Sequence, residues 1–203
     1  MWYYRSFFWR KLHSLTGVIP VGLFLLEHFT VNSFATRGPE AYNRAVAFLQ
    51  GLPFLLAIEI VFIFLPLALH AGYGLWVVYT GSINVRSYPY FRNWMYLLQR
   101  VTGVIVLLFL IYHIYALRLA RIFTGAEVSF EQVAAHLASP LVLALYVPGL
   151  LAAIFHLSNG LVTWAIGWGI ITGPKAQTGA SIFGGIIFCA LTVVGFSFLL
   201  AFI

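Results

Sequence analysis

Four histidines carry the clearest chemical signal in this sequence, because each lies inside a long apolar stretch. They are His28, His70, His113 and His156. An ionisable side chain within such a stretch is costly in a membrane and is by default functional. Neutral imidazole is a common metal ligand and also a proton carrier. The four positions therefore point to cofactor or metal binding, or to proton transfer.

The elements that position these histidines are expected to be membrane-spanning helices. Only 8% of the 203 residues are charged and 62% are apolar, a balance that a water-soluble domain does not carry. Five stretches reach the length of about 20 residues that crosses the hydrocarbon, at residues 12–33, 55–79, 97–118, 141–168 and 180–203. The first has no small-residue cleavage pattern, so we expect it to be retained and not removed as a signal peptide. The predicted fold is an all-α bundle of five transmembrane helices in a single membrane domain, 1–203.

Helix geometry places the histidines in two layers. Measured from the middle of each stretch at a rise of about 1.5 Å per residue, His28 and His113 lie roughly 8 Å to the outer side of the bilayer centre. His70 and His156 lie roughly 3 to 5 Å to the inner side, so that the layers are about 12 Å apart. Two metal ions in one coupled site would lie only about 3.5–4 Å apart, whereas each layer suits a planar macrocycle clamped between two imidazoles. The pattern predicts two b-type haems between helices 1 to 4.

Other roles for the same histidines stay open at this point. Each could be a hydrogen-bonded polar residue between helices. A zinc site would need further ligands beyond the two imidazoles of one layer, and copper is a further alternative. The single cysteine, Cys189, excludes disulfides within the chain and thiolate-held clusters. The sequence also lacks a Cys-x-x-Cys-His motif, so any haem would be held non-covalently.

Two glycines are expected to lie beside the haems. Gly17 precedes His28 by eleven residues, which places it about 20° away on the helix surface and about 16 Å inward, next to the inner haem. Gly149 precedes His156 by seven residues and would face the outer haem. A missing side chain makes room for a porphyrin, although small residues also mediate ordinary helix packing in lipid.

Two further histidines are not expected to be axial ligands. His13 lies at the inner interface beside Arg10 and Lys11, where it could bond a haem propionate or simply extend toward water. His136 lies in an outer connection. Neither matches a predicted haem layer.

Glu59 is a candidate for proton exchange with a quinone. It precedes His70 by eleven residues, so it occupies the same stripe of the second helix, about 16 Å outward, at or slightly above the outer haem. Alternatively it is an interfacial acid that pairs with Arg44 or with solvent.

The basic residues sit in short connections between the spans, which is an orientation signal and not a nucleic-acid one. Seven lie on the side of the N-terminus: Arg5, Arg10, Lys11, Arg86, Arg92, Arg100 and Lys175. Four lie opposite: Arg37, Arg44, Arg118 and Arg121. All five acids lie at or near that second side: Glu27, Glu40, Glu59, Glu127 and Glu131. The positive-inside rule therefore predicts a cytoplasmic N-terminus.

The first four helices are expected to form an internal repeat, 12–81 and 98–167. At an offset of 86 residues, 16–19 aligns with 102–105. Four single positions also align: His70, Gly74, Leu75 and Gly81 with His156, Gly160, Leu161 and Gly167. An even number of spans separates the copies, so the repeat would be parallel, with its axis along the membrane normal. The fifth helix, 180–203, has no counterpart.

Several longer runs resemble a known family. They read RKLHSL at 10–15, GVIPVG at 17–22, YFRNWM at 90–95, LQRVTG at 98–103, FH at 155–156 and SNG at 158–160. In this order they resemble the di-haem cytochrome b membrane-anchor subunit of Bacillus-type succinate:menaquinone oxidoreductases, a relative of the di-haem quinol:fumarate reductases. The resemblance covers essentially the whole chain.

The resemblance implies a bacterial cell-membrane protein that binds two haem b groups and works with a flavoprotein subunit and an iron–sulfur subunit. Its four ligands would be the same four histidines that the depth argument selects. It further implies an inner, higher-potential haem near the iron–sulfur subunit and an outer, lower-potential haem near menaquinone. The basic inner face, including Arg5, Arg10, Lys11, Arg86 and Arg92, would dock the iron–sulfur subunit. One departure is Ile154, which stands where some related fumarate reductases carry a glutamate, so a proton pathway through that position is in doubt.

Three functions are distinguished at this stage. The first is a respiratory anchor that links succinate oxidation to menaquinone, for which the chain has no succinate site or nucleotide fingerprint of its own. The second is a stand-alone four-histidine transmembrane cytochrome, or a quinol:fumarate reductase anchor. The third is a haem-free transporter or structural anchor that uses its histidines as proton relays.

Overall fold

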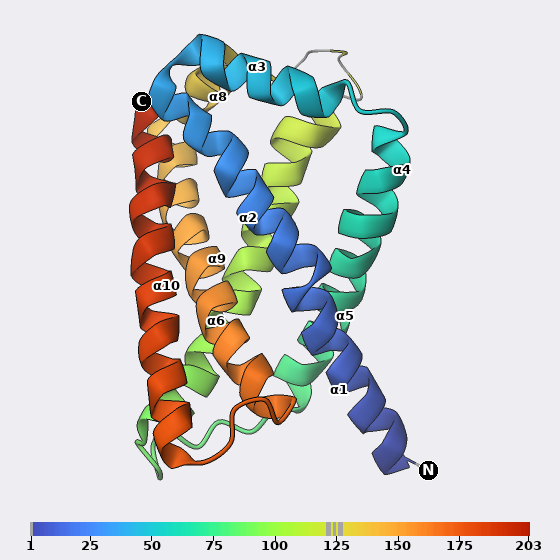
Figure 1. Cartoon of the computed structure of the whole chain (residues 1–203), viewed down its shortest axis with the longest axis vertical. Helices are drawn as coiled ribbons and strands as arrows, with labels where there is room; N and C mark the ends of the chain where they lie inside the picture. The colour runs from blue at the N-terminus through green and yellow to red at the C-terminus, as the bar shows by residue number, and fades with distance from the viewer. Residues whose placement is uncertain (1, 121–122, 124, 126–127) are drawn as a thin grey trace.

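The computed structural model describes residues 2–120, 123, 125 and 128–203, with the side chains from residue 7 onward. Within these residues five helical spans are long and apolar enough to cross a membrane: Phe7–Arg37, Leu55–Thr80, Phe91–Leu119, Pro140–Gly167 and Pro174–Ala201. They form an elongated bundle with the two chain termini at opposite ends (Figure 1). The predicted fold class, an all-α membrane bundle of five helices, is confirmed.

Three of the spans contain an interruption. The first consists of α1 (Trp2–Val18), α2 (Pro20–Ser33) and the 3₁₀ turn η1 (Phe34–Arg37). The break falls at Ile19, because Pro20 has no N–H to continue the hydrogen-bond ladder. The second consists of α4 (Leu55–Glu59), the π-helix η2 (Ile60–Phe64) and α5 (Leu65–Thr80), and the third of α6 (Phe91–His113) and the π-helix η3 (Ile114–Leu119). The fourth and fifth are the uninterrupted helices α9 (Pro140–Gly167) and α10 (Pro174–Ala201).

The fifth helix begins earlier than its apolar stretch predicted. It starts at Pro174, after Gly173 with φ 80°, and not at residue 180. Proline fits the first turn of a helix, where its missing N–H has no intrahelical partner in any case. The first turns therefore contain the polar residues Lys175, Gln177 and Thr178, which hydropathy alone assigned to the connection.

Two short helices lie in connections that were predicted to be plain loops. They are α3 (Pro39–Gln50) and α8 (Phe130–Leu137), and both lie at the end of the bundle that holds the C-terminus (Figure 1). Ser129 caps α8 by accepting a hydrogen bond from the N–H of Gln132 at 3.3 Å. The amide of Asn43 in α3 joins the two helices, because its Oδ1 accepts from the N–H of Phe130 at 2.8 Å.

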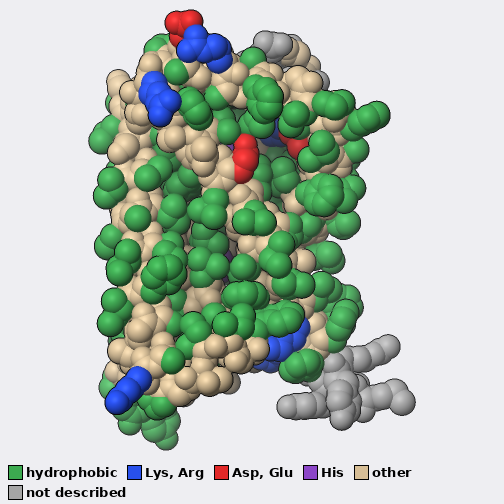
Figure 2. All heavy atoms as spheres, in the orientation of Figure 1, with side chains coloured by type: hydrophobic (Ala, Val, Ile, Leu, Met, Phe, Trp, Pro, Cys, Tyr) green, Lys and Arg blue, Asp and Glu red, His purple; other side chains and the backbone are tan. Residues whose placement is uncertain are grey.

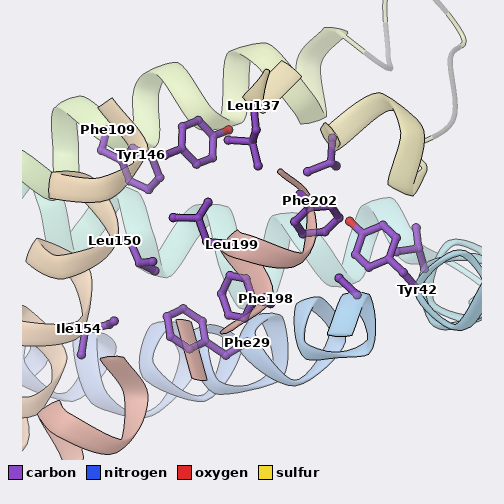
Figure 3. Close-up of a cluster of buried hydrophobic side chains, with 13 residues drawn as sticks. Phe29, Tyr42, Phe109, Leu137, Tyr146, Leu150, Ile154, Phe198, Leu199 and Phe202 are labelled. Atoms are coloured by element: carbon purple, nitrogen blue, oxygen red, sulfur yellow. The ribbon is translucent and has the colours of Figure 1, made fainter. Parts of the chain in front are cut away.

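The spans pack as two hairpins with the fifth helix against them. Helix α1 packs along α5, and α6 packs along α9. The hairpins meet where α1 contacts α9, and α10 lies against α9 and α2. A buried apolar cluster fills the C-terminal end of the bundle, where Phe29, Leu150, Phe198 and Phe202 meet (Figure 3).

The outer surface fits a hydrocarbon environment. Figure 2 shows hydrophobic side chains over most of the height of one face, with Lys and Arg side chains near the two ends. The acidic side chains visible on this face lie toward the end that carries the C-terminus. This distribution is that of a protein whose middle contacts lipid and whose ends contact water.

Candidate functional site

The structure brings the four histidines together in the two pairs predicted from their depth. The rings of His28 in α2 and His113 at the end of α6 have centroids 5.7 Å apart and planes at 88°. The rings of His70 in α5 and His156 in α9 have centroids 6.1 Å apart and planes at 86°. An imidazole nitrogen binds a metal at about 2 Å, so two ligands on opposite sides of one metal have ring centroids roughly 6 Å apart. Both separations are compatible with one bis-imidazole centre for each pair.

Each histidine pair supplies two imidazoles, and in the described part of the chain no third side chain is arranged to complete a metal site with them. Among the described residues, no group of three or more His, Cys, Asp or Glu side chains is arranged to hold a metal ion. A closed zinc site takes four such ligands, or three with an open position. The pairs therefore match axial ligation of a macrocycle better than a site for a free metal ion.

The rings of His70 and His156 are held in the same way by the preceding helix of their hairpin. The Nδ1 of His70 lies 2.9 Å from the backbone carbonyl of His13, and the Nδ1 of His156 lies 3.1 Å from that of Gln99. Because a carbonyl only accepts, Nδ1 is the protonated nitrogen in both rings. Nε2 is then unprotonated and available as a ligand.

The hydrogen bonds in both hairpins are reciprocal. The Nδ1 of His13 donates back to the carbonyl of His70 at 3.0 Å, and the Nε2 of Gln99 donates back to the carbonyl of His156 at 2.9 Å. The rings of His13 and His70 also stack, with centroids 4.2 Å apart and planes at 9°. His13 was predicted to bond a propionate or extend toward water, and the structure gives its Nδ1 a different partner.

The other pair is held differently. The Nδ1 of His113 lies 3.1 Å from the hydroxyl of Tyr146, a buried residue of α9. The ring of Tyr146 also lies edge-on to Phe109, with centroids 5.1 Å apart. A hydroxyl both donates and accepts, so this contact leaves the tautomer of His113 undetermined.

Gly17 lies directly against the ring of His70. A Cβ at position 17 would come within 2.3 Å of the Cε1 of His70, closer than real Cβ contacts. Gly103 stands in the same relation to His156, at 2.9 Å from its Cε1. The prediction that Gly17 makes room for a porphyrin therefore needs correction, because the ring of His70 occupies the space left by its missing side chain.

Gly149 also has a role different from the predicted one. Its hypothetical Cβ would lie 2.4 Å from the ring of Phe109, one helical turn before His113. The ring of Phe109 lies 5.4 Å from that of His113. The missing side chain of Gly149 thus lets α9 approach Phe109, and the ring of Phe109 fills the space predicted for a porphyrin.

Glu59 forms an ion pair, but with Arg118 and not with Arg44. The Nε of Arg118 donates to both carboxylate oxygens of Glu59, at 3.1 and 3.2 Å, and its Nη2 makes a further short contact. The side chains are 16% and 23% exposed, so the pair is largely shielded. Arg44 instead pairs with Glu40 at 2.5 Å on the surface. Glu59 immediately precedes η2 and Arg118 lies in η3, and π-helical segments of this kind are frequent at functional sites.

His136 lies in neither histidine pair. It belongs to α8, where its ring stacks on Tyr112 with centroids 5.8 Å apart and lies 5.7 Å from Tyr146. Burial lowers the pKa of His136 below its ordinary value. His136 thus contacts Tyr146, the residue whose hydroxyl lies beside the Nδ1 of His113.

The basic side chains at the N-terminal end are partly engaged within the bundle. Lys11 donates to the carbonyl of Gly167 and lies over the ring of Trp168, 4.9 Å from its centroid. The guanidinium of Arg100 lies 3.3 Å from the ring centroid of Tyr96. Of the predicted charged residues, Arg121, Glu127 and the side chain of Arg5 fall outside the described part of the chain.

Four residues that the structure places beside the histidines or Glu59 were not predicted to be site residues. They are Gln99, Gly103, Arg118 and Tyr146. The offset of 86 residues pairs Gln99 with His13 and Gly103 with Gly17, so the repeat carried a signal for two of them. Nothing in the sequence distinguishes Tyr146 or Arg118 from other interfacial residues.

Two comparisons with known proteins find sequences similar to this chain. A family model described as the succinate dehydrogenase/fumarate reductase transmembrane subunit matches residues 82–194. The chain is also 48% identical over 199 residues to the succinate dehydrogenase cytochrome b558 subunit of Bacillus subtilis (strain 168). That alignment covers 98% of this chain and 98% of the relative.

Proposed function

The chain belongs to the succinate dehydrogenase/fumarate reductase transmembrane subunit family, and on that basis we propose that it is the membrane-anchoring di-haem cytochrome b subunit of a succinate dehydrogenase. In this role it connects the iron–sulfur subunit to menaquinone and has no succinate site of its own. The flavoprotein subunit carries the succinate chemistry. The complex lies in the bacterial cell membrane with the N-terminus of this chain in the cytoplasm.

The observation that carries this proposal is the pairing of the four histidines. His28 with His113 would hold the outer haem, and His70 with His156 the inner one, at the centroid separations given above. Bound between two imidazoles, a haem supplies reversible one-electron transfer. What the chain contributes is burial, fixed ring orientation and charge around each site.

Buried donors near the N-terminal end support the inner site. The Nε of Arg100 and the Nε1 of Trp164 are buried and have no hydrogen-bond partner among the described residues. Trp164 lies eight residues beyond His156 in α9, toward the N-terminal end of the bundle, and Arg100 follows Gln99 in α6. An unpaired buried donor is costly, so a carboxylate such as a haem propionate is a suitable partner for either one.

The orientation proposal rests on charge. The N-terminal end carries Arg10, Lys11, Arg86, Arg92 and Lys175, while the described acids lie toward the other end. We propose that this basic end docks the iron–sulfur subunit. The same end is cytoplasmic by the positive-inside rule.

We also propose that residues 12–81 and 98–167 are two copies of one unit. Support comes from contacts that recur at the offset of 86 residues. The carbonyls of His13 and Gln99 bind the ring nitrogens of His70 and His156, and Gly17 and Gly103 face those rings. Residues 180–203 stand outside the repeat as the fifth helix.

The proposal is tested by purifying the chain from its native membrane under mild conditions. We expect two haem b per chain by reduced-minus-oxidised spectroscopy, together with co-purifying flavoprotein and iron–sulfur subunits and succinate:menaquinone activity. A stand-alone cytochrome would contain haem without the two soluble subunits. A preparation that stays colourless after reconstitution with haem would contradict both.

Replacement of Glu59 by glutamine tests its proposed role in proton exchange with the quinone. The substitution removes the carboxylate and leaves the Arg118 guanidinium without this ion-pair partner. Because a positioned proton donor contributes about 10²–10⁴-fold, we expect quinone reduction to fall by about tenfold or more. The haem spectrum should be unchanged, since Glu59 is not a ligand. Turnover should be measured with succinate and a menaquinone analogue.

Two matched variants separate this role from general damage. Glu59→Asp keeps a carboxylate and should retain most of the turnover. Glu40→Gln removes an ion pair on the surface at this end, whose side chains are 70% and 86% exposed, and should have no effect because exposed pairs contribute little. Normal quinone turnover in Glu59→Gln would exclude the proposed role.

A further inference from the structure

The reciprocal hydrogen bonds of the two hairpins are the same device built from different side chains. In each hairpin the ligand ring donates to a backbone carbonyl on the neighbouring helix. The side chain of the residue that owns this carbonyl then donates to the backbone carbonyl of the ligand. The residue is His13 in one hairpin and Gln99 in the other, 86 positions apart, as are His70 and His156.

From this geometry we infer that His13 and Gln99 are equivalent positioning residues at the inner site. The backbone carbonyl of each sets the tautomer of His70 or His156, and the side chain of each helps to hold the orientation of that ring. The inference rests on the proposed haem-binding function. It assigns His13 a role as support for a ligand, in place of an axial ligand or a propionate contact.

Surrounding residues hold both carbonyls in the same way. The hydroxyl of Thr16 lies 3.0 Å from the carbonyl oxygens of both Leu12 and His13. The hydroxyl of Thr102 lies 2.7 Å from that of Leu98 and 3.3 Å from that of Gln99, so each hydroxyl shares its one hydrogen between two carbonyls. The carbonyl that accepts from the imidazole is therefore also contacted by a threonine of its own helix.

Glycines allow the close helix approach that the device needs. Gly74 lies against His13, with 3.2 Å between its hypothetical Cβ and the Cε1 of that ring. Gly160 stands 86 positions later, and a hypothetical Cβ there would lie 3.3 Å from the Nε2 of Gln99. Each supporting side chain is thus held on the far side by a glycine of the ligand-bearing helix.

The hydrogen bond from the ligand has a direct chemical effect. An imidazole that donates its Nδ1–H to a fixed acceptor keeps Nε2 unprotonated and becomes a more basic ligand. Without the hydrogen bond from the side chain of residue 13 to the carbonyl of His70, one hydrogen bond instead of two joins α1 and α5 at this point. We expect the ring of His70 to lose its fixed orientation as a result.

The test compares His13→Leu with His13→Gln, which installs the side chain found in the other hairpin. In the purified complex we expect His13→Leu to weaken retention of the inner haem by about tenfold, the lower end of the effect of losing a group behind a metal ligand. Haem transfer to excess apomyoglobin measures this retention. A tenfold change in the reduction equilibrium of that haem would appear as 59 mV in a redox titration. His13→Gln should stay within about threefold of wild type for both quantities.

Matched controls confine the effect to this device. Gln99→Leu should reproduce the effect of His13→Leu on the same haem, through His156. His136→Leu removes a histidine at the opposite end of the bundle and should leave the inner haem unchanged. Equal retention and potential in wild type and His13→Leu would overturn the inference while leaving the haem-binding function intact.

A second measurement tests the hydrogen bonds of His70 and His156 in protein that contains no haem. Nitrogen-15 spectra of histidine-labelled, haem-free protein should show the Nδ1–H tautomer for His70 and His156 in the wild type. In His13→Leu the Nδ1–H signal of His70 should move toward that of a more weakly hydrogen-bonded imidazole, because the return bond that holds the two helices together at this point is lost. A mixture already present in the wild type would contradict the inference, and a protein that never binds haem would contradict the proposed function separately.

Discussion

Replacing His70 by alanine is expected to remove one haem and to leave the other in place. His70 and His156 face each other across the inner site, with ring centroids 6.1 Å apart. Without one of them a single imidazole holds the macrocycle from one side only. We expect the haem content to fall from two to one per chain. Loss of the hydrogen-bond partner of a metal ligand lowers activity by about 10–100-fold. Loss of the ligand itself should lower succinate:menaquinone activity by more than this.

The pairing makes this prediction specific. His156→Ala should remove the same spectral component as His70→Ala, and His28→Ala and His113→Ala should both remove the other component. His136→Ala should retain both haems, because His136 lies in neither pair. The measurement is a low-temperature reduced-minus-oxidised spectrum of each purified variant. Loss of the same component in His28→Ala and His70→Ala would show that the pairs are wrongly assigned.

Gly17→Ala is expected to be nearly as damaging as loss of a ligand, although it adds only one methyl group. The new Cβ would lie 2.3 Å from the Cε1 of His70, whose ring is fixed by its bond to the carbonyl of His13 and by stacking on that side chain. Either α1 or the ring must move. Overpacking of this kind costs about 1–3 kcal/mol, and displacement of the ring should release most of the inner haem. Haem content and thermal unfolding of the purified complex measure the two effects.

The same substitution elsewhere provides a graded series. Gly103→Ala places its Cβ 2.9 Å from the Cε1 of His156, so we expect the same effect in weaker form. Gly72→Ala in α5 meets nothing within 4 Å and should be neutral or slightly stabilising, since alanine is the better helix former. Full inner-haem content in Gly17→Ala would contradict the close approach seen in the structure.

Hydropathy and helix geometry were sufficient to predict the spans and the two histidine pairs. Both depend on distance along a regular helix, which the sequence encodes directly. The start of the fifth helix at Pro174 was missed because the polar turn after Gly173 carries no apolar signal. Helices α3 and α8 were missed for a related reason, since a short amphipathic helix at the interface lacks the long apolar run that identifies a span.

Contacts between helices could not be predicted in the same way. The alternative interpretation of Glu59 paired it with Arg44 or with solvent, but the structure pairs it with Arg118 from the third span. Gly149 was placed by helix register on a porphyrin-facing stripe, yet the ring of Phe109 occupies that space. Both outcomes depend on how α6 rotates against its neighbours, which no single helix determines. His13 was predicted to bond a haem propionate or to extend toward water, and its contact with His70 was missed because the two residues lie 57 positions apart.

The reciprocal bonds have a consequence for how such a protein is made. In each hairpin the ligand and the carbonyl that orients it belong to consecutive membrane spans, in α1 and α5 of one hairpin and in α6 and α9 of the other. A hairpin can therefore orient its ring as soon as it has entered the membrane, before the other half has been synthesised. Each ring faces a ring from the other hairpin. Binding of a haem between them would therefore join two hairpins whose rings are already oriented. In evolutionary terms, two identical hairpins related by a twofold axis would present the same facing pair of imidazoles. Gene duplication and fusion would then allow the two supporting residues to diverge to histidine and glutamine.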